Sequence, residues 1–533
     1  MHLVLLNPTP PGISSFGVRS ISAFLRSKGH RVTLVFFPGS LGLLKEGGDF
    51  SYQYTPEVIA QVVNLCKGAD LIGISFFTNY LDRALQLTRQ LRTTTGIPVI
   101  WGGIHASTKP RESLDHTDMV CIGEGEFPLL ELLDKMSRAE NYHDVKGIWF
   151  KGTDGQIIEN PLHPLINDLD SLPFFDFFND HHYILNPKTK QIDKLTDKIV
   201  RETMPLMPNR SGRLLRTYRT MTDRGCPHKC TYCNVPTLKR IYRDDKSPFL
   251  RSRSPMNVIE ELVARLKQFP FIQAIHVFDD TFFARPFSYI KEFAKLYKKL
   301  INLPMYCQAS PNTLTEKKLQ VLVDAGLIYV EMGIQTGSAR VRAMYLRPES
   351  NKQILQAAKL LHAFRQFLIP PDYHIILDNP WENEEDTMET VRLLHSIPKP
   401  FGLAISSLVF YPKTDLYERA LSEGLIKDEM KEISLKPFYV PPKKSYVNFL
   451  IYLMTFPLFP KFIMSFLIRD GVVGKASTMN LKFVFKVIYA LGETNRLFMK
   501  GARAILKGDM QRIRLYFEKL KMGDPVVAGR KGK

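Results

Sequence analysis

The sequence predicts an α/β protein with two successive series of strands and helices and a mostly helical C-terminal region. Short apolar runs alternate with amphipathic stretches over residues 1–140, and the same alternation returns over residues 216–425. The last hundred residues lose this pattern. Strands that alternate with helices at this spacing form parallel sheets. A chain of 533 residues, 44% of them hydrophobic, is long enough for two or three domains with cores of their own.

The first series predicts strands at residues 2–7, 31–36, 71–75, 98–101 and 119–122. Stretches with helical periodicity lie between them, at residues 17–28, 56–66, 79–92 and 126–136. This order predicts a doubly wound (Rossmann-like) parallel sheet, which binds ligands beyond the carboxyl ends of its strands. The candidate binding residues at those ends are Thr9, Ser75, Gly102, Gly103, His105, Gly123 and Glu124.

A hairpin is predicted next, with strands at residues 147–150 and 156–160 around Asp154-Gly155, since Asp-Gly is a strong turn signal. The Pro-rich stretches that follow indicate an extended linker. Residues 185–215 are basic and irregular and carry no readable motif.

The second series predicts six strands, at residues 218–222, 274–278, 305–309, 328–333, 373–377 and 404–410. Helices are expected between them, among them residues 258–268, 289–300, 317–324 and 385–396. In βα barrels the active-site groups come from the carboxyl ends of the strands. Functional residues are therefore expected directly after each strand.

Three cysteines, Cys226, Cys230 and Cys233, stand in one short loop after the first of these strands. Iron–sulfur clusters normally take four cysteines, so a cubane held by three would leave one iron open for a ligand that is not protein. A zinc knuckle is the alternative, since His228 lies inside the loop and structural zinc takes four ligands. The six cysteines of the chain do not make a disulfide framework, which suits a reducing compartment.

The spacing Cys-x3-Cys-x2-Cys, with Tyr232 before the third cysteine, resembles the signature of the radical S-adenosylmethionine (SAM) superfamily. The resemblance implies a [4Fe–4S] cluster whose open iron is chelated by the amino and carboxylate groups of SAM. Reductive cleavage of SAM would give a 5′-deoxyadenosyl radical, with an electron donor such as flavodoxin or ferredoxin. The six strand–helix units match the partial (β/α)6, TIM-like barrel of this family.

The resemblance also implies which strand ends contact SAM. Asp279 and Asp280 stand where the family has a Gly-Gly-Glu-like segment for the SAM amino group, although one of them could cap the next helix. Gln335 and Ser338 lie in a segment similar to the one that meets the SAM ribose and methionine, with Gln335 in place of a common Glu. Two further candidates, for SAM or substrate contact, are Gln308 and Ser310.

Residues 1–140 resemble the cobalamin-binding domain that precedes the barrel in one subgroup of this superfamily, most clearly over residues 101–106 and 122–126. Glycines there would let the backbone approach a flat corrin ring. The Asp-x-His-x-x-Gly motif that supplies a lower cobalt ligand is absent, which implies a cobalt with no histidine below it. His105 is a candidate ligand, pocket residue or turn residue. The alternative is a sheet that has lost its ligand and serves as a scaffold or dimer surface.

The resemblance therefore implies four segments: a cobalamin-binding-like domain (1–140), a hairpin and linker (141–215), a radical SAM partial barrel (216–425) and a helical, basic-hydrophobic C-terminal region (426–533). It implies a cobalamin-dependent enzyme that functionalises an unactivated carbon. Methyl transfer is favoured over oxidative cyclisation or rearrangement; the anaerobic Mg-protoporphyrin ester cyclase and the hopanoid methylases share this layout. A tRNA methylthiotransferase would carry a second cysteine triad near the N-terminus, where only Cys66 and Cys121 occur. A corrinoid- or metal-responsive binding protein is the non-enzymatic alternative.

The net charge and the C-terminal region indicate which partners the protein binds. The net charge of +19 indicates attraction to an acidic partner such as anionic lipid, and no specific nucleic acid is expected. Residues 449–468 are mostly apolar but are interrupted by Pro457, Pro460 and Lys461, too broken to span a membrane. With the basic stretch that follows, they predict either an interfacial element on lipid or a helical cap on the barrel. No signal peptide is recognisable, so we expect a cytoplasmic enzyme, with peripheral membrane contact as an option and a small-molecule or lipid-like substrate.

Overall fold

The structure is a computed structural model that describes residues 1–8, 12–37, 53–152, 154–186, 189–434, 445–456, 459–479 and 487. The chain divides into two compact units, which are described separately. Unit 1 comprises Met1–Met204, Met221–Phe269 and Phe410–Pro437. Unit 2 comprises Pro205–Thr220, Pro270–Val409 and Phe438–Lys533.

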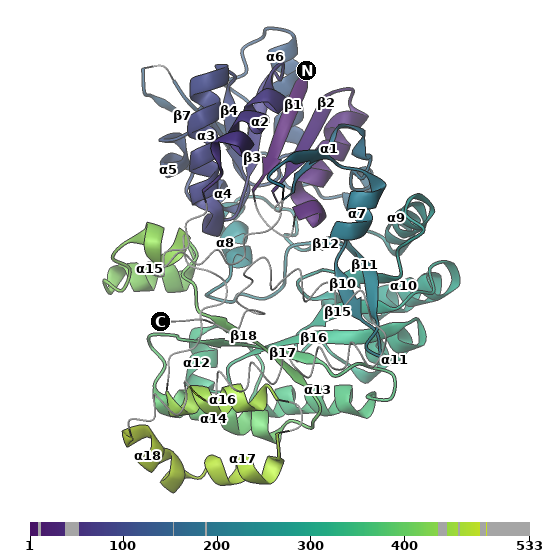
Figure 1. Ribbon diagram of the computed structural model, residues 1–533, viewed down its shortest axis with the longest axis vertical. Coiled ribbons are helices and arrows are strands. Elements are labelled where there is room, and N and C mark those ends of the chain that lie inside the picture. Colours follow the sequence, from purple (N-terminus) through teal and green to yellow (C-terminus); the bar gives the residue numbers. More distant parts are fainter. Residues whose placement is uncertain are drawn as a thin grey trace. The chain divides into compact units, whose positions relative to one another are not determined.

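A sheet of nine strands, counted over the described residues, forms the centre of unit 1 (Figure 1). Its order is β7-β6-β5-β4-β3-β1-β2-β8-β9, and the strands from β5 to β8 run parallel to one another. The strands are β1 (His2–Asn7), β2 (Arg31–Phe36), β3 (Leu71–Ser75), β4 (Val99–Gly102), β5 (Met119–Cys121), β6 (Ile148–Lys151), β7 (Ile157–Glu159), β8 (Tyr183–Leu185) and β9 (Ile192–Lys194). The predicted doubly wound parallel sheet is confirmed.

Antiparallel hairpins extend this sheet at both edges. The β6–β7 hairpin is the one that Asp154-Gly155 predicted. The β8–β9 hairpin pairs with β2 on the other edge, so the description of residues 185–215 as irregular was wrong in part. Helix α7 (Asp197–Thr203) and strand β10 (Leu206–Pro208) also lie in that stretch.

Helices pack in pairs in unit 1, α1 against α6 and α2 against α3. Phe24 of α1 contacts Phe127 of α6, with ring centroids 4.8 Å apart. The helices of this part are α1 (Phe16–Ser27), α2 (Pro56–Cys66), α3 (Leu81–Thr95), α4 (Ile104–Thr108), α5 (Pro110–Leu114) and α6 (Glu126–Ser137). Unit 1 also contains the two-stranded β12 (Asp223–Arg224) and β13 (Arg251–Ser252), and the helices α8 (Asn234–Ile241), α9 (Pro255–Gln268) and α15 (Asp415–Ser422).

A second sheet forms the centre of unit 2, in the order β10-β11-β14-β15-β16-β17-β18 over the described residues. Six of its strands run parallel and only β10 is antiparallel, which confirms the predicted partial barrel. These six are β11 (Leu214–Thr220), β14 (Ala274–Val277), β15 (Met305–Ala309), β16 (Leu327–Gln335), β17 (Asp372–Leu377) and β18 (Gly402–Ser407). The connecting helices are α10 (Phe287–Leu300), α11 (Glu316–Asp324), α12 (Ala339–Met344), α13 (Asn351–Ala363) and α14 (Glu384–Ser396).

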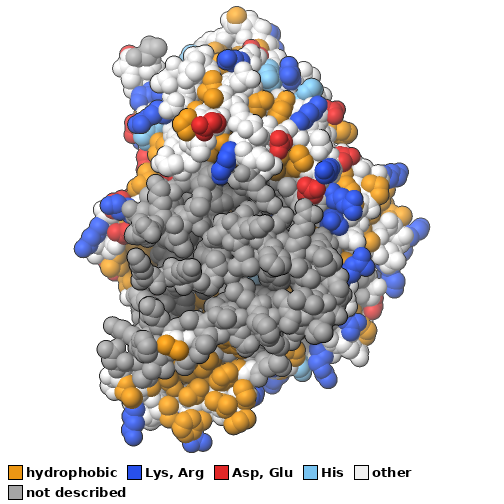
Figure 2. All heavy atoms as spheres, in the orientation of Figure 1, with side chains coloured by type: hydrophobic (Ala, Val, Ile, Leu, Met, Phe, Trp, Pro, Cys, Tyr) orange, Lys and Arg blue, Asp and Glu red, His pale blue; other side chains and the backbone are white. Residues whose placement is uncertain are grey.

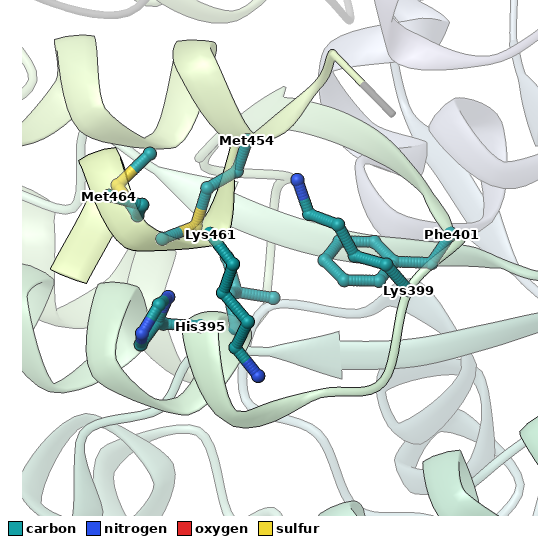
Figure 3. Close-up of a pocket in the computed structure, with 7 residues that line it drawn as sticks. His395, Lys399, Phe401, Met454, Lys461 and Met464 are labelled. Carbon is teal, nitrogen blue, oxygen red and sulfur yellow. The ribbon is translucent and has the colours of Figure 1, made fainter. Parts of the chain in front are cut away.

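The predicted apolar run at residues 449–468 divides into two helices with different surroundings. Helix α16 (Tyr446–Met454) is buried along its whole length and packs on α14, as a helical cap would. Helix α17 (Lys461–Leu467) instead exposes Phe462 and Phe466. A small pocket lies where these helices meet α14, lined by His395, Lys399, Phe401, Met454, Lys461, Met464 and Leu394 (Figure 3). Among the described residues no helix is long and apolar enough to cross a membrane.

Candidate functional site

The three-cysteine loop connects β12 to α8 in unit 1. It does not follow β11 directly, because the short strand β12, which pairs with β13, intervenes. The loop begins at Gly225, which has a φ of +93°. A Cβ at this position would lie 2.5 Å from the carbonyl oxygen of Phe249, so the sharp entry into the loop requires glycine.

The three thiols differ in exposure: Cys230 is buried, and Cys226 and Cys233 are half-buried. Cys233 is the N-cap of α8, and its sulfur accepts a hydrogen bond from the Val235 amide at 3.5 Å. The amides of a helix N-terminus stabilise negative charge, which is the state of a thiolate ligand. No group of three His, Cys, Asp or Glu side chains within the described residues could hold a single metal ion. In a cubane each thiolate binds its own iron, so the donor set of this loop fits that cluster.

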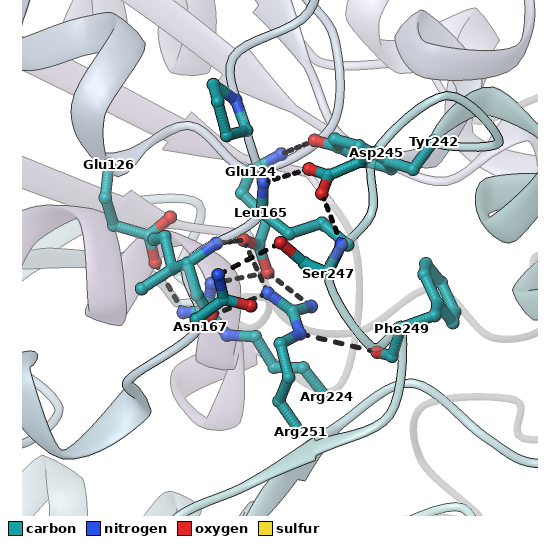
Figure 4. Close-up of polar contacts among 12 residues, drawn as sticks. Glu124, Glu126, Leu165, Asn167, Arg224, Tyr242, Asp245, Ser247, Phe249 and Arg251 are labelled. Atoms are coloured by element: carbon teal, nitrogen blue, oxygen red, sulfur yellow. Dashed lines mark hydrogen bonds and ion pairs between the residues drawn. The ribbon is translucent and has the colours of Figure 1, made fainter.

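A network of charged side chains holds the start of the loop (Figure 4). The guanidinium group of Arg224 lies 2.9 Å from an oxygen of Glu124 and 2.5 Å from an oxygen of Glu126. It also donates to the hydroxyl of Ser20 at 3.0 Å. The residue directly before Gly225 is thus tied to the loop after β5 and to α1.

The same Glu124 carboxylate also binds the strand that pairs with β12. Arg251 of β13 reaches both of its oxygens at 3.0 Å, and the Ile166 amide donates to it at 2.9 Å. The Glu124 amide donates to the Tyr242 hydroxyl at 3.0 Å. Burial alone would raise the pKa of Glu124, but the two guanidinium groups and the amide hold it below its ordinary value. We name Glu124, Glu126, Arg224, Tyr242 and Arg251 the Glu124 network.

The network gives other contacts to two residues of the loop after β5 that were predicted to bind the cofactor. Glu124 was predicted to bind the cofactor, but its carboxylate is occupied by Arg224 and Arg251. Gly123 was expected to let a corrin ring approach. A Cβ there would lie 1.8 Å from the Tyr242 hydroxyl, so contact with this tyrosine requires the glycine.

The other candidates in this domain differ in accessibility. Thr9 lies outside the described residues. Ser75 is half-buried at the end of β3, and Gly103 packs against the backbone of Phe76. Gly102, at the end of β4, has open space where a Cβ would be. Of these positions Gly102 leaves the most room for a flat ligand.

His105 lies inside the domain, on α4, with 1% of its surface exposed. Its ring stacks on Phe76 with centroids 5.3 Å apart, and its Nδ1 lies 3.3 Å from the Thr78 hydroxyl. Burial lowers the pKa of His105 to about 3, so the ring is neutral. This placement favours packing over the ligand and turn roles that the sequence left open.

The structure separates the two aspartates that follow β14 in unit 2. Asp279 is fully buried and pairs with Arg285 at 3.0 Å. Asp280 is exposed, yet the surrounding protein, with the Asp279 carboxylate, raises its pKa to about 6. The N-caps of the two helices that follow are Thr281 and Pro286, so neither aspartate caps them. Asp280 is therefore the better candidate for the SAM amino group.

Two serines predicted to contact SAM or substrate are buried. Ser338 has no exposed surface, caps α12 by accepting from the Val341 amide, and donates to Asp386 at 2.7 Å. Ser310 is 5% exposed, and its backbone is bonded to the Thr313 side chain. Ser338 is thus a cap in this structure, and its predicted contact with SAM does not fit its surroundings.

Two candidate amides remain accessible on the sheet. Gln335, the last residue of β16, is half-buried and has a φ of +69°. For a residue with a side chain such a backbone is costly and recurs at functional sites. Gln308 donates to Glu331 at 3.3 Å. The strand ends of unit 2 therefore present Asp280 and Gln335.

Comparisons with known proteins agree with this description. The model of the radical SAM superfamily matches residues 222–394, and that of the B12 binding domain matches residues 4–133. An uncharacterized methyltransferase of Pyrococcus horikoshii is 25% identical over 67% of this chain and 70% of its own length. The cytidylyl-2-hydroxyethylphosphonate methyltransferase of Streptomyces wedmorensis is 26% identical, over 69% and 73% respectively. The anaerobic magnesium-protoporphyrin IX monomethyl ester cyclase of Rubrivivax gelatinosus is 25% identical, over 70% and 62%.

Solved structures show the same fold. The radical SAM methyltransferase TsrM of Kitasatospora setae, with tryptophan and a SAM analogue bound, superposes with a TM-score of 0.59 at 15% identity, over 80% of this chain and 77% of its own. The cobalamin-dependent SAM radical enzyme OxsB gives 0.60 at 15% identity, over 85% and 66%.

The chain carries a B12-binding domain followed by a domain of the radical SAM superfamily. It is an enzyme whose cofactors are a [4Fe–4S] cluster, SAM and cobalamin. The predicted family and class are confirmed, and the non-enzymatic alternative is not favoured. The roles of individual site residues and the limits of the four segments stay predictions.

Proposed function

We propose that this protein is a methyltransferase that transfers a methyl group to an unactivated carbon of a small-molecule substrate. The observation that carries the proposal is the pairing, on one chain, of a B12-binding domain with a radical SAM domain whose loop has three cysteines. Two of the relatives named above are methyltransferases, as is the structural neighbour TsrM.

The residues of this chain have separate tasks in the proposal. Cys226, Cys230 and Cys233 would hold the cluster, and the Glu124 network keeps the start of their loop in place. When bound, the cluster would supply the electron that cleaves SAM, and cobalamin would carry the methyl group. At the strand ends of unit 2, the Asp280 carboxylate would bind the SAM ammonium group and Gln335 would accept from a ribose hydroxyl.

The proposal is tested with the full-length protein after anaerobic reconstitution with iron, sulfide and cobalamin. SAM labelled in its methyl group is supplied together with a small-molecule extract, and flavodoxin or ferredoxin provides electrons. Mass spectrometry should detect 5′-deoxyadenosine and a product that carries the label. Formation of 5′-deoxyadenosine with an unlabelled, oxidised product would instead identify a cyclase or rearrangement enzyme.

Peripheral contact with an anionic membrane is a second proposal, and the exposed face of α17 supports it. Phe462, Ile463 and Phe466 are exposed there, and Arg469 lies over the Phe466 ring at 5.5 Å. Figure 2 shows hydrophobic side chains gathered over this end of unit 2, with basic side chains beside them. Aromatic side chains next to basic ones are typical of interfacial helices. We place the enzyme in the cytoplasm, with this face on the lipid.

Flotation with anionic vesicles tests this contact. The wild-type protein should float with the vesicles and be released at high salt, because salt screens surface charges. The double variant Phe462→Ser, Phe466→Ser should lose flotation and keep its melting temperature, since both side chains are exposed. Equal flotation of the variant would contradict the proposal.

A further inference from the structure

The two faces of the second sheet differ in composition. In β16 the side chains of Val330, Met332 and Ile334 are buried, while the alternating Glu331 and Gln335 are half-buried. Strand β17 repeats this, with Tyr373 and Ile375 buried and His374 half-buried. Because successive side chains of a strand point to opposite faces, one face is apolar and packed and the other is polar.

Polar side chains of five strands lie on the polar face, and we name one from each the polar row: Arg219 of β11, His276 of β14, Gln308 of β15, Glu331 of β16 and His374 of β17. Asp372 of β17, the register partner of Glu331, lies on the same face and accepts from the Tyr329 hydroxyl. In the strand register Arg219 is opposite His276, and Gln308 is opposite Glu331. Below the row the same face continues as an apolar floor, formed by Leu215, Ala274, Tyr306 and Tyr329.

At one end of the row the charges are satisfied within the protein. Glu331 accepts from Gln308 at 3.3 Å and lies 3.6 Å from Nε2 of His374. Burial opposes ionisation of Glu331, but these groups, with His276 and Arg219, hold its pKa below the ordinary value. Glu331 is therefore a carboxylate with partners.

At the other end buried nitrogens of two basic side chains lack hydrogen-bond partners within the described part of the chain. His276 is 1% exposed, and both of its ring nitrogens are buried with no partner. The Nε of Arg219 is likewise buried with no partner, and its guanidinium carbon lies 4.7 Å from the centroid of the Phe278 ring. Burial lowers the pKa of His276 to about 4, so at neutral pH its ring offers one donor and one acceptor. Burying these three nitrogens without hydrogen-bond partners costs stability, which indicates a site kept for a ligand.

This end lies deeper in the sheet than the residues assigned to SAM. His276 precedes Asp280 by four residues, and Glu331 precedes Gln335 by four residues. Arg219 and His276 each lie one residue before the end of their strand, β11 and β14, whereas Asp280 lies three residues after the end of β14. A molecule bound by Asp280 and Gln335 thus leaves Arg219 and His276 for a second ligand.

We propose that Arg219 and His276 bind an oxyanion, a carboxylate or a phosphate, of the small-molecule substrate. The inference rests on the proposed function, since it assigns the polar face to the substrate. It excludes a purely hydrocarbon substrate, which would leave both buried groups without partners. A guanidinium group recognises the planar carboxylate and the phosphate with paired hydrogen bonds, and the His276 N–H would add a third.

The first experiment measures anion binding without catalysis. The full-length, cluster-loaded protein is titrated anaerobically with inorganic phosphate and with propionate, against sodium chloride of equal ionic strength, and melting temperature is followed. One of the two anions should raise the melting temperature of the wild-type protein. In Arg219→Gln and in His276→Leu the apparent affinity should fall by about tenfold or more. The control is Arg213→Gln, an exposed arginine of the preceding turn, which should behave as wild type.

Stability distinguishes a binding role from a structural one. Since Arg219 forms no ion pair with a carboxylate in the described structure, Arg219→Gln should keep or raise the melting temperature while anion binding is lost. A large fall in melting temperature would show that Arg219 is structural, and equal anion binding by wild type and Arg219→Gln would overturn the site. Whichever of propionate and phosphate raises the melting temperature identifies the anion as a carboxylate or a phosphate.

SAM binding and product analysis separate this inference from the proposed function. Arg219→Gln should bind SAM as wild type does; an equal loss of SAM affinity would assign the oxyanion to the SAM carboxylate and overturn the substrate site. Labelled products should be retained on anion exchange, and a neutral hydrocarbon product would contradict the inference. A further outcome is that the anion raises the melting temperature of the wild-type protein, and Arg219→Gln loses this response, while no methylated product is formed. That result would contradict methyl transfer and still support the oxyanion site.

Discussion

The Glu124 network and the polar row are both built from buried basic and acidic groups, but they differ in how these groups are satisfied. In the network each carboxylate meets a guanidinium group: Glu124 binds Arg224 and Arg251, and Glu126 binds Arg224. In the polar row the Glu331 end has partners, whereas Arg219 and His276 keep buried nitrogens without partners in the described structure. A fully paired network holds a structure together, and an incompletely paired one suggests a place for a ligand.

The two regions also differ in what they are attached to. The network joins the loop after β5 to strands β12 and β13, which flank the segment with the three cysteines, so it fixes the geometry of a loop. The polar row lies on strands of one sheet, so the backbone already fixes its geometry. Charged partners are therefore needed in the first region for order and in the second for binding.

The largest effect is expected in the loop that the network holds. Cys230→Ala removes one of three cluster ligands, and reductive formation of 5′-deoxyadenosine should fall below detection. The fold should persist, since the cysteine lies on a loop outside both sheets. Product analysis, iron content and circular dichroism are measured together. If Cys230→Ala still forms 5′-deoxyadenosine, Cys230 is not a ligand of the cluster. The control is Cys66→Ala, a buried cysteine of α2, which should keep cleavage.

Glu124→Gln should produce the next largest effect, on stability. Removing one partner from a buried charge network leaves the others uncompensated, at a cost of about 3 kcal/mol or more in the free energy of unfolding. Urea unfolding of the full chain measures this. Glu140→Gln is the matched control, because Glu140 pairs with Arg138 at the surface and its loss should change little.

The Glu124→Gln variant also tests whether the network shapes the cysteine loop that would hold the cluster. If Glu124 positions the cysteine loop, reconstituted Glu124→Gln should show an altered electron paramagnetic resonance spectrum of the reduced cluster. The surface variant should show the wild-type spectrum. An unchanged spectrum in a destabilised Glu124→Gln protein would mean that the network stabilises the fold without shaping the loop.

Asp280 allows a test by pH at the strand ends. Its pKa is raised to about 6, so the carboxyl is charged above that pH and neutral below it. SAM carries an ammonium group, so SAM affinity should weaken as the pH falls from 7 through 6, by roughly tenfold in all if one charge-assisted hydrogen bond is lost. Asp280→Asn should bind SAM weakly at every pH and lose this dependence, as equilibrium binding would show. The same pH dependence in the variant would assign it to another group.

Sequence patterns predicted the strands that are buried on both faces. Residues 2–7, 31–36 and 71–75 match β1, β2 and β3 because continuous apolar runs have few other uses in an α/β protein. The β8–β9 hairpin at the edge of the sheet was missed, since strands of three residues are too short to show a periodicity. Short edge strands are recognisable only once the sheet they extend is known.

The candidate site shows the same limit. The three cysteines are close in sequence, so their spacing alone identified them. Arg251 lies 127 residues from Glu124, and no local pattern connects them, so Glu124 was assigned to a cofactor instead of to its arginines. The polar row was missed for the same reason, because one residue from each of five strands has meaning only in the assembled sheet.

Ser338 gives the smallest expected effect and tests a residue type that sequence cannot interpret alone. A serine at a helix start suits a cap as well as a ligand contact, and here its hydroxyl caps α12 and donates to Asp386. Ser338→Ala should lower the free energy of unfolding by about 1 kcal/mol, the usual cost of a lost cap. Its SAM affinity should equal that of wild type, because the hydroxyl has no exposed surface and is bonded within the protein. Unfolding and SAM-binding titrations on the same preparation decide the matter: weaker SAM binding at unchanged stability would restore Ser338 to the SAM site.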